Sequence, residues 1–245
     1  MIPWLNLNSP FPNLDSALTL KDGAPGLLAA GADLSPNRLI DAYSKGIFPW
    51  FNNNQPILWW STDPRFILNT QEFKISGSLK KSIKKIEKNI LKENEWQIKF
   101  NSDFLSVITA CAEPRKGVSG SWINSKIIEA YFELHKLGYA HSIELWFNKK
   151  LLSGVYGICI GRIFFGESMF TKINNGSKVT LSYLVHFLKS EGVKIIDCQQ
   201  ETNHLRNMGG KLITRKNFVS ILKEAIELPA ITTWKPKLIY NESFH

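Results

Sequence analysis

The stretch His141-Ser-Ile-Glu-Leu-Trp-Phe147 alternates apolar and polar residues in the way that a half-buried β-strand does. Two more runs, Leu151–Ile160 and Ile163–Phe165, follow across turn-length gaps and are rich in β-branched and aromatic residues. Such residues favour strands, and short gaps favour antiparallel neighbours. The three runs therefore predict an antiparallel meander, whose third strand ends in Gly166-Glu-Ser-Met-Phe170.

A helix and one more strand follow the meander. Apolar residues recur at helical spacing over about residues 177–190, and Gly192 is a stop signal. The short apolar strand 194–198 then carries Asp197 and Gln199 at its C-terminal end. This order resembles the central part of the acyl-CoA N-acyltransferase (GNAT) fold. We expect an α+β fold with a GNAT-like C-terminal domain, built on a mixed, mostly antiparallel sheet.

The segments around this unit alternate between helices, short strands and irregular chain. A Gly/Ser-rich loop is expected at 117–124, and the tail from Pro229 has no periodicity. Strands are expected at 96–100 and 212–214, and helices at 103–112, 127–137, 203–208 and 216–228.

The N-terminal part has a different character. Residues 1–25 are rich in turn-forming residues and predict an irregular wrap. A Ser-Pro pair at 35–36 predicts the start of a helix, with serine as N-cap and proline at the first helical position. Asp63-Pro64 is a suitable boundary. We expect a small N-terminal domain of residues 1–63 and a larger domain of residues 64–245.

Composition limits the class of protein. The chain has 245 residues with 44% hydrophobic residues, enough for a globular core. No apolar run approaches the roughly 20 residues of a membrane helix, and the N-terminus has no signal-peptide pattern. Three cysteines without close pairing suit a reducing cytoplasm. The net charge of +9 indicates either a polyanionic partner or a solvated basic surface.

One helix concentrates positive charge. Between residues 74 and 92, apolar residues at helical spacing define one face and lysines cover the rest, with only Glu87 in opposition. Charged helix faces are usually just solvated, but solvated faces usually mix signs. An unmixed face favours contact with phosphates. The lysines are Lys80, Lys81, Lys84, Lys85 and Lys88.

Acidic and amide side chains stand out in the central unit. Asp197 and Gln199 are two apart in a strand, so they should share one face, with Cys198 pointing to the other, into the core. An acid in an apolar strand costs desolvation unless something uses it. The pair either ties down the following turn or accepts hydrogen bonds from an attacking amine. Glu167 is a similar acid, among aromatic residues and beside a glycine.

Several kinds of site are disfavoured. The glycines of the central unit lie within strands and turns, so no Rossmann fingerprint is present. Residues 171–178 also lack the glycine-rich signature with which many GNAT enzymes hold coenzyme A. Cys198 and His204 match no zinc spacing, and we expect neither a metal nor a cofactor.

Five strings together are similar to one family. The aromatic cluster 47–51 and the run 56–61 could each serve as core packing or as a platform for a base. With three further strings, however, they resemble the leucyl/phenylalanyl-tRNA–protein transferases over most of the chain. The strings are Gly26-Leu-Leu-Ala-x-Gly-x-Asp-Leu-Ser-Pro36, Gly46-Ile-Phe-Pro-Trp-Phe51, Ile57-Leu-Trp-Trp-Ser-x-Asp-Pro-Arg65, Phe165-Gly-Glu-Ser-Met-Phe170 and Ile196-Asp-Cys-Gln199.

The resemblance implies an activity and a set of roles. Such enzymes move Leu or Phe, and Met less well, from aminoacyl-tRNA to the N-terminal Arg or Lys of a protein, which marks it for degradation. Asp197 and Gln199 would assist the attack. Trp50, Trp122 and Leu184 would hold the terminal adenosine, although Leu184 replaces a frequent aromatic residue. The aminoacyl pocket would consist of Val155, Gly166, Glu167, Ser168, Met169, Leu181 and Ile196, with Val155 in place of a frequent methionine.

The implied chemistry agrees with the residues. An aminoacyl ester is already activated, so aminolysis needs no ATP, metal or cofactor. Two alternatives remain: a small-molecule N-acyltransferase of the GNAT type, which would bind coenzyme A, and a non-catalytic tRNA-binding module, which would never turn over. We expect a cytoplasmic monomer that contacts no membrane.

Overall fold

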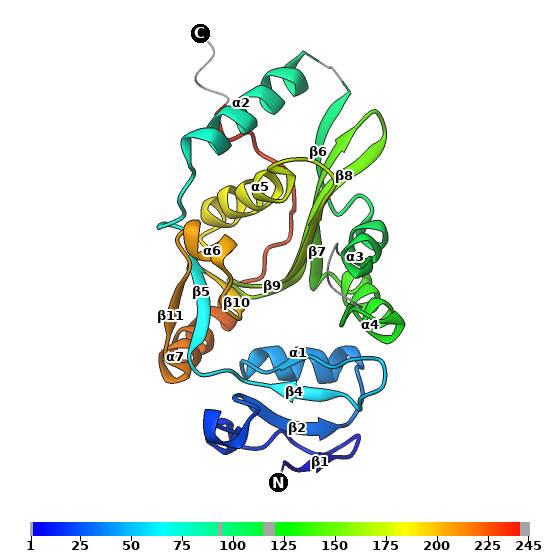
Figure 1. The fold of residues 1–245 in the computed structure, drawn as a ribbon, viewed down its shortest axis with the longest axis vertical. Helices are drawn as coiled ribbons and strands as arrows, with labels where there is room; N and C mark the ends of the chain where they lie inside the picture. Colours follow the sequence, from blue (N-terminus) through cyan, green and yellow to red (C-terminus); the bar gives the residue numbers. More distant parts are fainter. Residues whose placement is uncertain (1, 93–94, 115–120, 241–245) are drawn as a thin grey trace.

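A seven-stranded sheet forms the centre of the computed structural model, which describes residues 2–92, 95–114 and 121–240 (Figure 1). Its strand order is β11-β5-β10-β9-β8-β7-β6, in which β9 and β10 are parallel and all other neighbours are antiparallel. The predicted α+β fold with a mixed, mostly antiparallel sheet is confirmed. The strands are β5 (Arg65–Asn69), β6 (Trp96–Phe100), β7 (Ala140–Phe147), β8 (Lys150–Ile160), β9 (Ile163–Thr171), β10 (Ile195–Gln199) and β11 (Lys211–Ile213).

The central unit has the predicted order. Strands β7, β8 and β9 form the antiparallel meander, and α5 (Gly176–Ser190) leads into β10. β9 continues past Gly166 to Thr171. β10 returns parallel to β9, pairing residues 195–197 with residues 163–165. Three antiparallel strands, a helix and a parallel strand are the arrangement that the GNAT resemblance implies.

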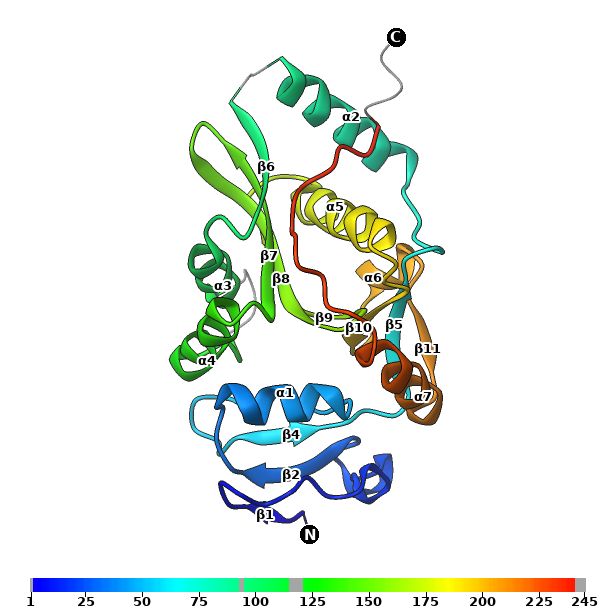
Figure 2. The same ribbon diagram turned by 180° about the vertical axis from the view of Figure 1, so that it is seen from behind.

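Helices cover both faces of this sheet (Figures 1 and 2). On one face lie α5 and the lysine-rich α2 (Gly77–Leu91), whose buried side chains Leu79, Ile83 and Ile86 join one apolar cluster. The other face packs against α3, α4 and α7, within a second cluster. The bounds of these helices and of the short α6 are α3 (Phe104–Ala112), α4 (Ser125–Lys136), α6 (Asn203–Asn207) and α7 (Arg215–Ile226).

The N-terminal part forms a second sheet, which the sequence did not predict. Its four strands have the order β1-β2-β4-β3 and are two to five residues long. Strands this short show no periodicity, so their pairing with distant partners is invisible along the chain. The helix predicted at 35–36 is confirmed, because Ser35 Oγ accepts from Arg38 N at 3.4 Å. The elements are β1 (Trp4–Leu5), β2 (Leu27–Gly31), α1 (Pro36–Ser44), β3 (Phe48–Pro49), β4 (Leu58–Trp60) and short 3₁₀ turns at Leu14–Ser16 and Leu20–Asp22.

The two sheets share one buried cluster. Trp59 of β4 and Tyr43 of α1 have no exposed surface and lie in the same cluster as Tyr131 of α4 and Phe218 of α7. The rings of Tyr43 and Phe165 are 5.0 Å apart and join α1 to β9. The domain boundary at Asp63-Pro64 stays a prediction.

One further segment, which follows α7, completes the described fold. After α7 the chain continues without regular structure, and it runs along α5 to reach α2 (Figure 2). We call residues 229–240 the C-terminal strap. Residues 117–120 of the predicted Gly/Ser loop lie outside the described residues. None of the helices in the described part of the chain is long and apolar enough to cross a membrane.

Candidate functional site

A cavity of about 830 Å³ opens where β9 and β10 part. Their parallel pairing ends at Phe165 and Asp197, and beyond Gly166 the two strands no longer pair. The cavity is lined by Phe48, Pro49, Trp50, Ala110, Glu113, Pro114, Trp122, Val155, Gly166, Glu167, Ser168, Met169, Phe170, Thr171, Lys172, Ser177, Leu181, Leu184, Ile196, Cys198, Gln199, Gln200, Thr202, His204 and Leu205. The structure therefore brings together every residue predicted for the aminoacyl pocket and the adenosine site.

One wall of the cavity is apolar. Val155 of β8, Met169 of β9, Leu181 and Leu184 of α5, and Ile196 of β10 line it and belong to the cluster on the α5 face. The wall is thus built on regular elements, whose backbones are held by strand pairing and helix packing. A pocket of this size and composition suits a ligand with an apolar group.

The two predicted tryptophans also line the cavity, and both are more exposed than the nearby Trp59. Trp50 is 38% exposed and packs against Trp60, with ring centroids 5.5 Å apart. Trp60 Nε1 also donates to the Trp50 carbonyl at 2.7 Å. Trp122 is half-buried, whereas Trp59 is completely buried. Trp59 therefore packs in the core, whereas Trp50 lines the cavity, and its use as a platform for a base stays a prediction.

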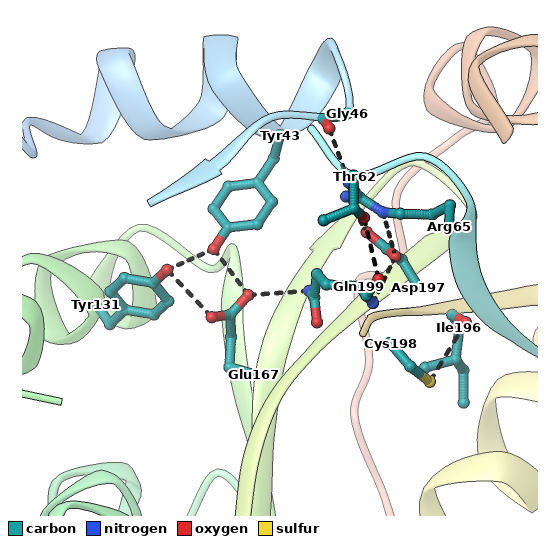
Figure 3. Close-up of polar contacts among 10 residues, drawn as sticks. All are labelled: Tyr43, Gly46, Thr62, Arg65, Tyr131, Glu167, Ile196, Asp197, Cys198 and Gln199. Carbon is teal, nitrogen blue, oxygen red and sulfur yellow. Dashed lines mark hydrogen bonds and ion pairs between the residues drawn. The ribbon is translucent and has the colours of Figure 1, made fainter. Parts of the chain in front are cut away.

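Glu167 is held by two tyrosines (Figure 3). Its Oε1 accepts from Tyr43 Oη at 2.7 Å, its Oε2 accepts from Tyr131 Oη at 3.2 Å, and the two hydroxyls contact each other. Burial raises the pKa of Glu167 to about 7, although both tyrosine hydrogen bonds act in the other direction. Its carboxyl group therefore changes charge near neutral pH.

Gln199 places its amide between Glu167 and two backbone carbonyls. As drawn in Figure 3, Nε2 donates to Glu167 Oε1 over 3.5 Å. With the amide turned by 180°, the nitrogen instead donates to the carbonyls of Gly166 at 2.9 Å and Cys198 at 3.0 Å. We favour the turned orientation, because it makes two shorter hydrogen bonds. The amide oxygen then faces Glu167, and the two oxygens form an acceptor pair that suits an amine.

Asp197 does not line the cavity. It is completely buried, and its carboxylate accepts from Arg65, from Nε at 2.8 Å and from Nη2 at 2.7 Å. Asp197 Oδ1 also accepts from the Gln199 backbone N–H at 3.0 Å. Arg65 is held in turn by the Gly46 carbonyl at 3.1 Å. Asp197 is therefore linked to the cavity by its hydrogen bond to the Gln199 backbone.

The prediction of which side chains share a face of β10 was partly wrong. A register shift lies between Asp197 and Gln199, and Gln199 has a positive φ of 55°. Simple alternation therefore fails at the strand end: Cys198 lines the cavity, and Asp197 turns to the interior. Burial raises the pKa of the Cys198 thiol, which keeps it protonated and unsuited to be a nucleophile.

The predicted lysines lie outside the cavity, on α2. Lys80, Lys81, Lys85 and Lys88 are exposed and Lys84 is half-buried. This helix touches the start of α5, where Asn175 Nδ2 donates to Ser82 Oγ at 3.3 Å. Because Ser177, two residues further along, lines the cavity, the lysine-bearing helix adjoins the element that carries the cavity wall.

Three residues of the site were not predicted from the sequence: Tyr43, Tyr131 and Arg65. The tyrosines belong to apolar helix faces and carry no local sign of a polar role. Arg65 begins an otherwise apolar strand, and a charge in such a strand requires a partner when buried. The lone acid of the other apolar strand, Asp197, was available as that partner. Among the described residues no group of three His, Cys, Asp or Glu side chains could hold a metal ion.

The family models and the similar sequences agree on one family. A family model described as leucyl/phenylalanyl-tRNA protein transferase matches residues 67–223, and the model of its N-terminal domain matches residues 32–63. A leucyl/phenylalanyl-tRNA–protein transferase of Janthinobacterium sp. (strain Marseille) is 54% identical over 98% of this chain and 99% of its own. The protein of that name from Paraburkholderia phytofirmans is 49% identical over 94% and 93%. Among solved structures, FemX aligns with a TM-score of 0.42 at 10% identity, over 77% of this chain and 71% of that chain.

Proposed function

The chain belongs to the leucyl/phenylalanyl-tRNA–protein transferase family, and from this premise we propose that it moves Leu or Phe, and Met less well, from aminoacyl-tRNA to acceptor proteins. The acceptors carry an N-terminal Arg or Lys, and the transfer marks them for degradation in the N-degron (N-end rule) pathway. The observation that carries this proposal is the cavity, where an apolar wall, two tryptophans and an acceptor pair of oxygens occur together.

The donor fits the cavity by chemical type. The side chain of Leu or Phe would lie against Val155, Met169, Leu181 and Ile196, with Gly166 and Ser168 beside it. The terminal adenosine would stack on Trp50 and Trp122, a contact worth about 1–3 kcal/mol per base, with Leu184 adding apolar contact. A volume of about 830 Å³ lies within the range of pockets that enclose small ligands of this kind.

The acceptor would approach the pair formed by Glu167 and Gln199. Glu167 offers carboxylate oxygens to the N–H groups of the N-terminal amine, and the turned Gln199 amide offers its oxygen. An α-amino group has a pKa near 8, so roughly a tenth is neutral at pH 7. The two oxygens would orient this neutral amine toward the ester.

The reaction is an aminolysis. The amine nitrogen forms a bond to the ester carbonyl carbon, the bond between that carbon and the ribose oxygen breaks, and the proton that the amine loses is taken up by the leaving ribose oxygen. Holding the two reactants together can supply several kcal/mol. We propose that Gln199 contacts the amine and that Asp197, itself fixed by Arg65, positions Gln199 through its backbone N–H. This chemistry requires no metal, ATP or other cofactor.

The lysines of α2 would bind the tRNA backbone. Lys80, Lys81, Lys84, Lys85 and Lys88 extend a positive surface from a helix that adjoins the start of α5. Such contacts are independent of sequence and depend on salt. We further propose that the protein acts as a monomer in the cytoplasm.

One assay tests the function. Radiolabelled Leu-tRNA is incubated with the protein and a model substrate whose N-terminal residue is Arg, beside the same substrate with N-terminal Ala. Label should reach the Arg substrate alone. Label carried instead from acetyl-coenzyme A to a small amine would favour an N-acyltransferase of the GNAT type, and tRNA binding without transfer would indicate a binding module.

A further inference from the structure

The lysine-bearing helix α2 contains a single acidic residue, and that residue faces inward. Glu87 is completely buried, while four of the five lysines around it are exposed. A buried carboxylate is costly unless its oxygens accept hydrogen bonds. The partners of Glu87 therefore decide whether this arrangement persists.

The C-terminal strap supplies most of these partners. Glu87 Oε1 accepts from the backbone N–H of Ile239 at 2.5 Å, and Oε2 accepts from the backbone N–H of Tyr240 at 3.1 Å. Tyr183 Oη of α5 donates the third hydrogen bond, at 2.9 Å. The single acid of α2 thus fastens the end of the strap to both helices.

The strap runs along α5 to α2 (Figure 2), and side-chain contacts anchor it on the way. The Trp234 ring stacks on His141 of β7, with centroids 3.6 Å apart and planes at 11°, and lies 4.9 Å from the Phe187 ring of α5. Lys237 Nζ donates to Ser190 Oγ at 3.0 Å at the end of α5. The strap is therefore a fixed element that connects the sheet and α5 to α2.

The strap also touches the lysines themselves. Lys80 Nζ and Lys84 Nζ lie 5.6 and 5.5 Å from the centre of the Tyr240 ring, within the range of cation–π attraction. Lys81 and Lys85 lie around the helix from these two, toward Ser82, which contacts the start of α5. The positive arc of α2 is thus bounded by the strap on one side and by α5 on the other.

We infer that the C-terminal strap is a positioning element of the tRNA-binding surface: it holds α2 against α5, keeps the only negative charge of that helix out of the surface, and orients Lys80 and Lys84. This inference rests on the proposed function of α2. Released from the strap, Glu87 would lose two of its three hydrogen-bond donors. Its carboxylate would then turn to water among the lysines and cancel part of their attraction for phosphates.

The variant Glu87→Gln distinguishes a strap that positions α2 from one that only fills space, because the two predict opposite changes in tRNA affinity. Removing a negative charge from a basic helix should strengthen tRNA binding if the strap only fills space. If the strap positions the helix, binding should weaken, because an amide has one acceptor oxygen for three donors and presents an NH₂ group to a backbone N–H. A chain that ends at Pro229 is the second variant, and Lys136→Ala, an exposed lysine on α4, is the matched control.

Two donors of the leucyl group distinguish an effect on the position of α2 from a general loss of structure. Leu-tRNA uses α2, whereas leucyl-adenosine, which lacks the tRNA body, uses only the cavity. We expect both strap variants to weaken tRNA binding and to leave transfer from leucyl-adenosine unchanged. Loss of about two phosphate contacts should lower the slope of log K against log [salt] by about two units. Between 50 and 200 mM salt, the affinity of the variants should therefore fall by a factor roughly tenfold smaller than that of the parent protein. Lys136→Ala should behave as the parent protein does.

Three results would overturn the inference: tRNA binding by Glu87→Gln as tight as that of the parent protein or tighter, unchanged binding by the shortened chain, or equal losses with both donors. The proposed function fails separately, if the unmodified protein transfers leucine from neither donor.

Discussion

Asp197 and Arg65 form a bidentate ion pair in which neither side chain has any exposed surface. It joins β10, which ends at the cavity, to the first residue of β5. The guanidinium also lies over the Phe48 ring at 4.9 Å and the Phe218 ring at 4.6 Å. A pair so enclosed makes each partner strongly dependent on the other, which leads to the first prediction.

Asp197→Ala should lower the free energy of unfolding by about 3–5 kcal/mol, because it leaves the Arg65 cation buried without its partner. Urea denaturation at pH 7 measures this loss. The control is Asp41→Ala, which removes an exposed partner of Lys45 and should cost less than about 1 kcal/mol. Equal stability of the two variants would contradict the assignment of Asp197 as a structural anchor.

Gln199→Ala should reduce single-turnover transfer far more than tRNA affinity, and Asp197→Ala should do the same at temperatures where it stays folded. Orientation or proton transfer of this kind is typically worth about 10²–10⁴-fold. Gln199→Ala also removes two hydrogen bonds to backbone carbonyls, so it should lower the melting temperature, but by less than Asp197→Ala does. Parent-like rates in a folded Gln199→Ala protein would remove this residue from the mechanism.

Stability should fall as the pH rises from about 4.5 to about 7, through Glu167. Its pKa is raised from 4.5 to about 7 by burial, so the folded protein retains a proton that the unfolded chain releases. This pH dependence is opposite in direction to that of a salt-bridged acid, and the loss of unfolding free energy is at most about 3 kcal/mol. The difference in unfolding free energy between the parent protein and Glu167→Gln, measured at pH 5, 6, 7 and 8, isolates this contribution. A difference that does not change with pH would show that Glu167 titrates normally.

The apolar wall predicts selection among donors. Leu, Phe and, more weakly, Met should be transferred, because a missing methylene or a poorer fit costs about 1–3 kcal/mol in such a pocket. Charged and β-branched side chains should be excluded. Competition between equal amounts of Leu-, Met-, Ile- and Val-tRNA measures the preference, and equal transfer of Leu, Ile and Val would refute it.

Reversing three charges on α2 tests the lysine surface directly. The triple variant Lys80→Glu, Lys84→Glu and Lys88→Glu should lose most of its tRNA affinity at low salt, and its salt slope should fall by about one unit for each lost phosphate contact. Transfer from leucyl-adenosine should be kept. Unchanged tRNA affinity would mean that these lysines are only solvated.

The sequence predicts the central unit well and the N-terminal part poorly, for a physical reason. The meander and α5 contain long periodic runs, whose buried face is visible from one residue to the next. The four short N-terminal strands are stabilised by partners far along the chain, so local patterns carry no trace of them.

Within the functional site, too, regular elements were predicted better than irregular ones. Residues that line the cavity from regular elements were predicted together, through the resemblance to a family. The strand end was predicted less well, because alternation presumes a regular backbone and Gln199 has a positive φ. Glu87 was taken as a counter-charge within the lysine face, and its burial depends on residues that lie 152 and 153 positions later in the chain. No local pattern could indicate that contact.

The shared cluster between the two sheets restricts how this chain can be recombined. Tyr43 and Trp59 pack without exposed surface in the same cluster as Tyr131 and Phe218. A chimaera that takes residues 1–63 from a distant relative would therefore bring foreign side chains into a close-packed interior, where even single methylene changes are felt. Residues 1–63 and the rest of the chain should therefore change together in evolution. Exchange of one segment should give a folded protein only when the residues that it contacts in the other segment are exchanged as well.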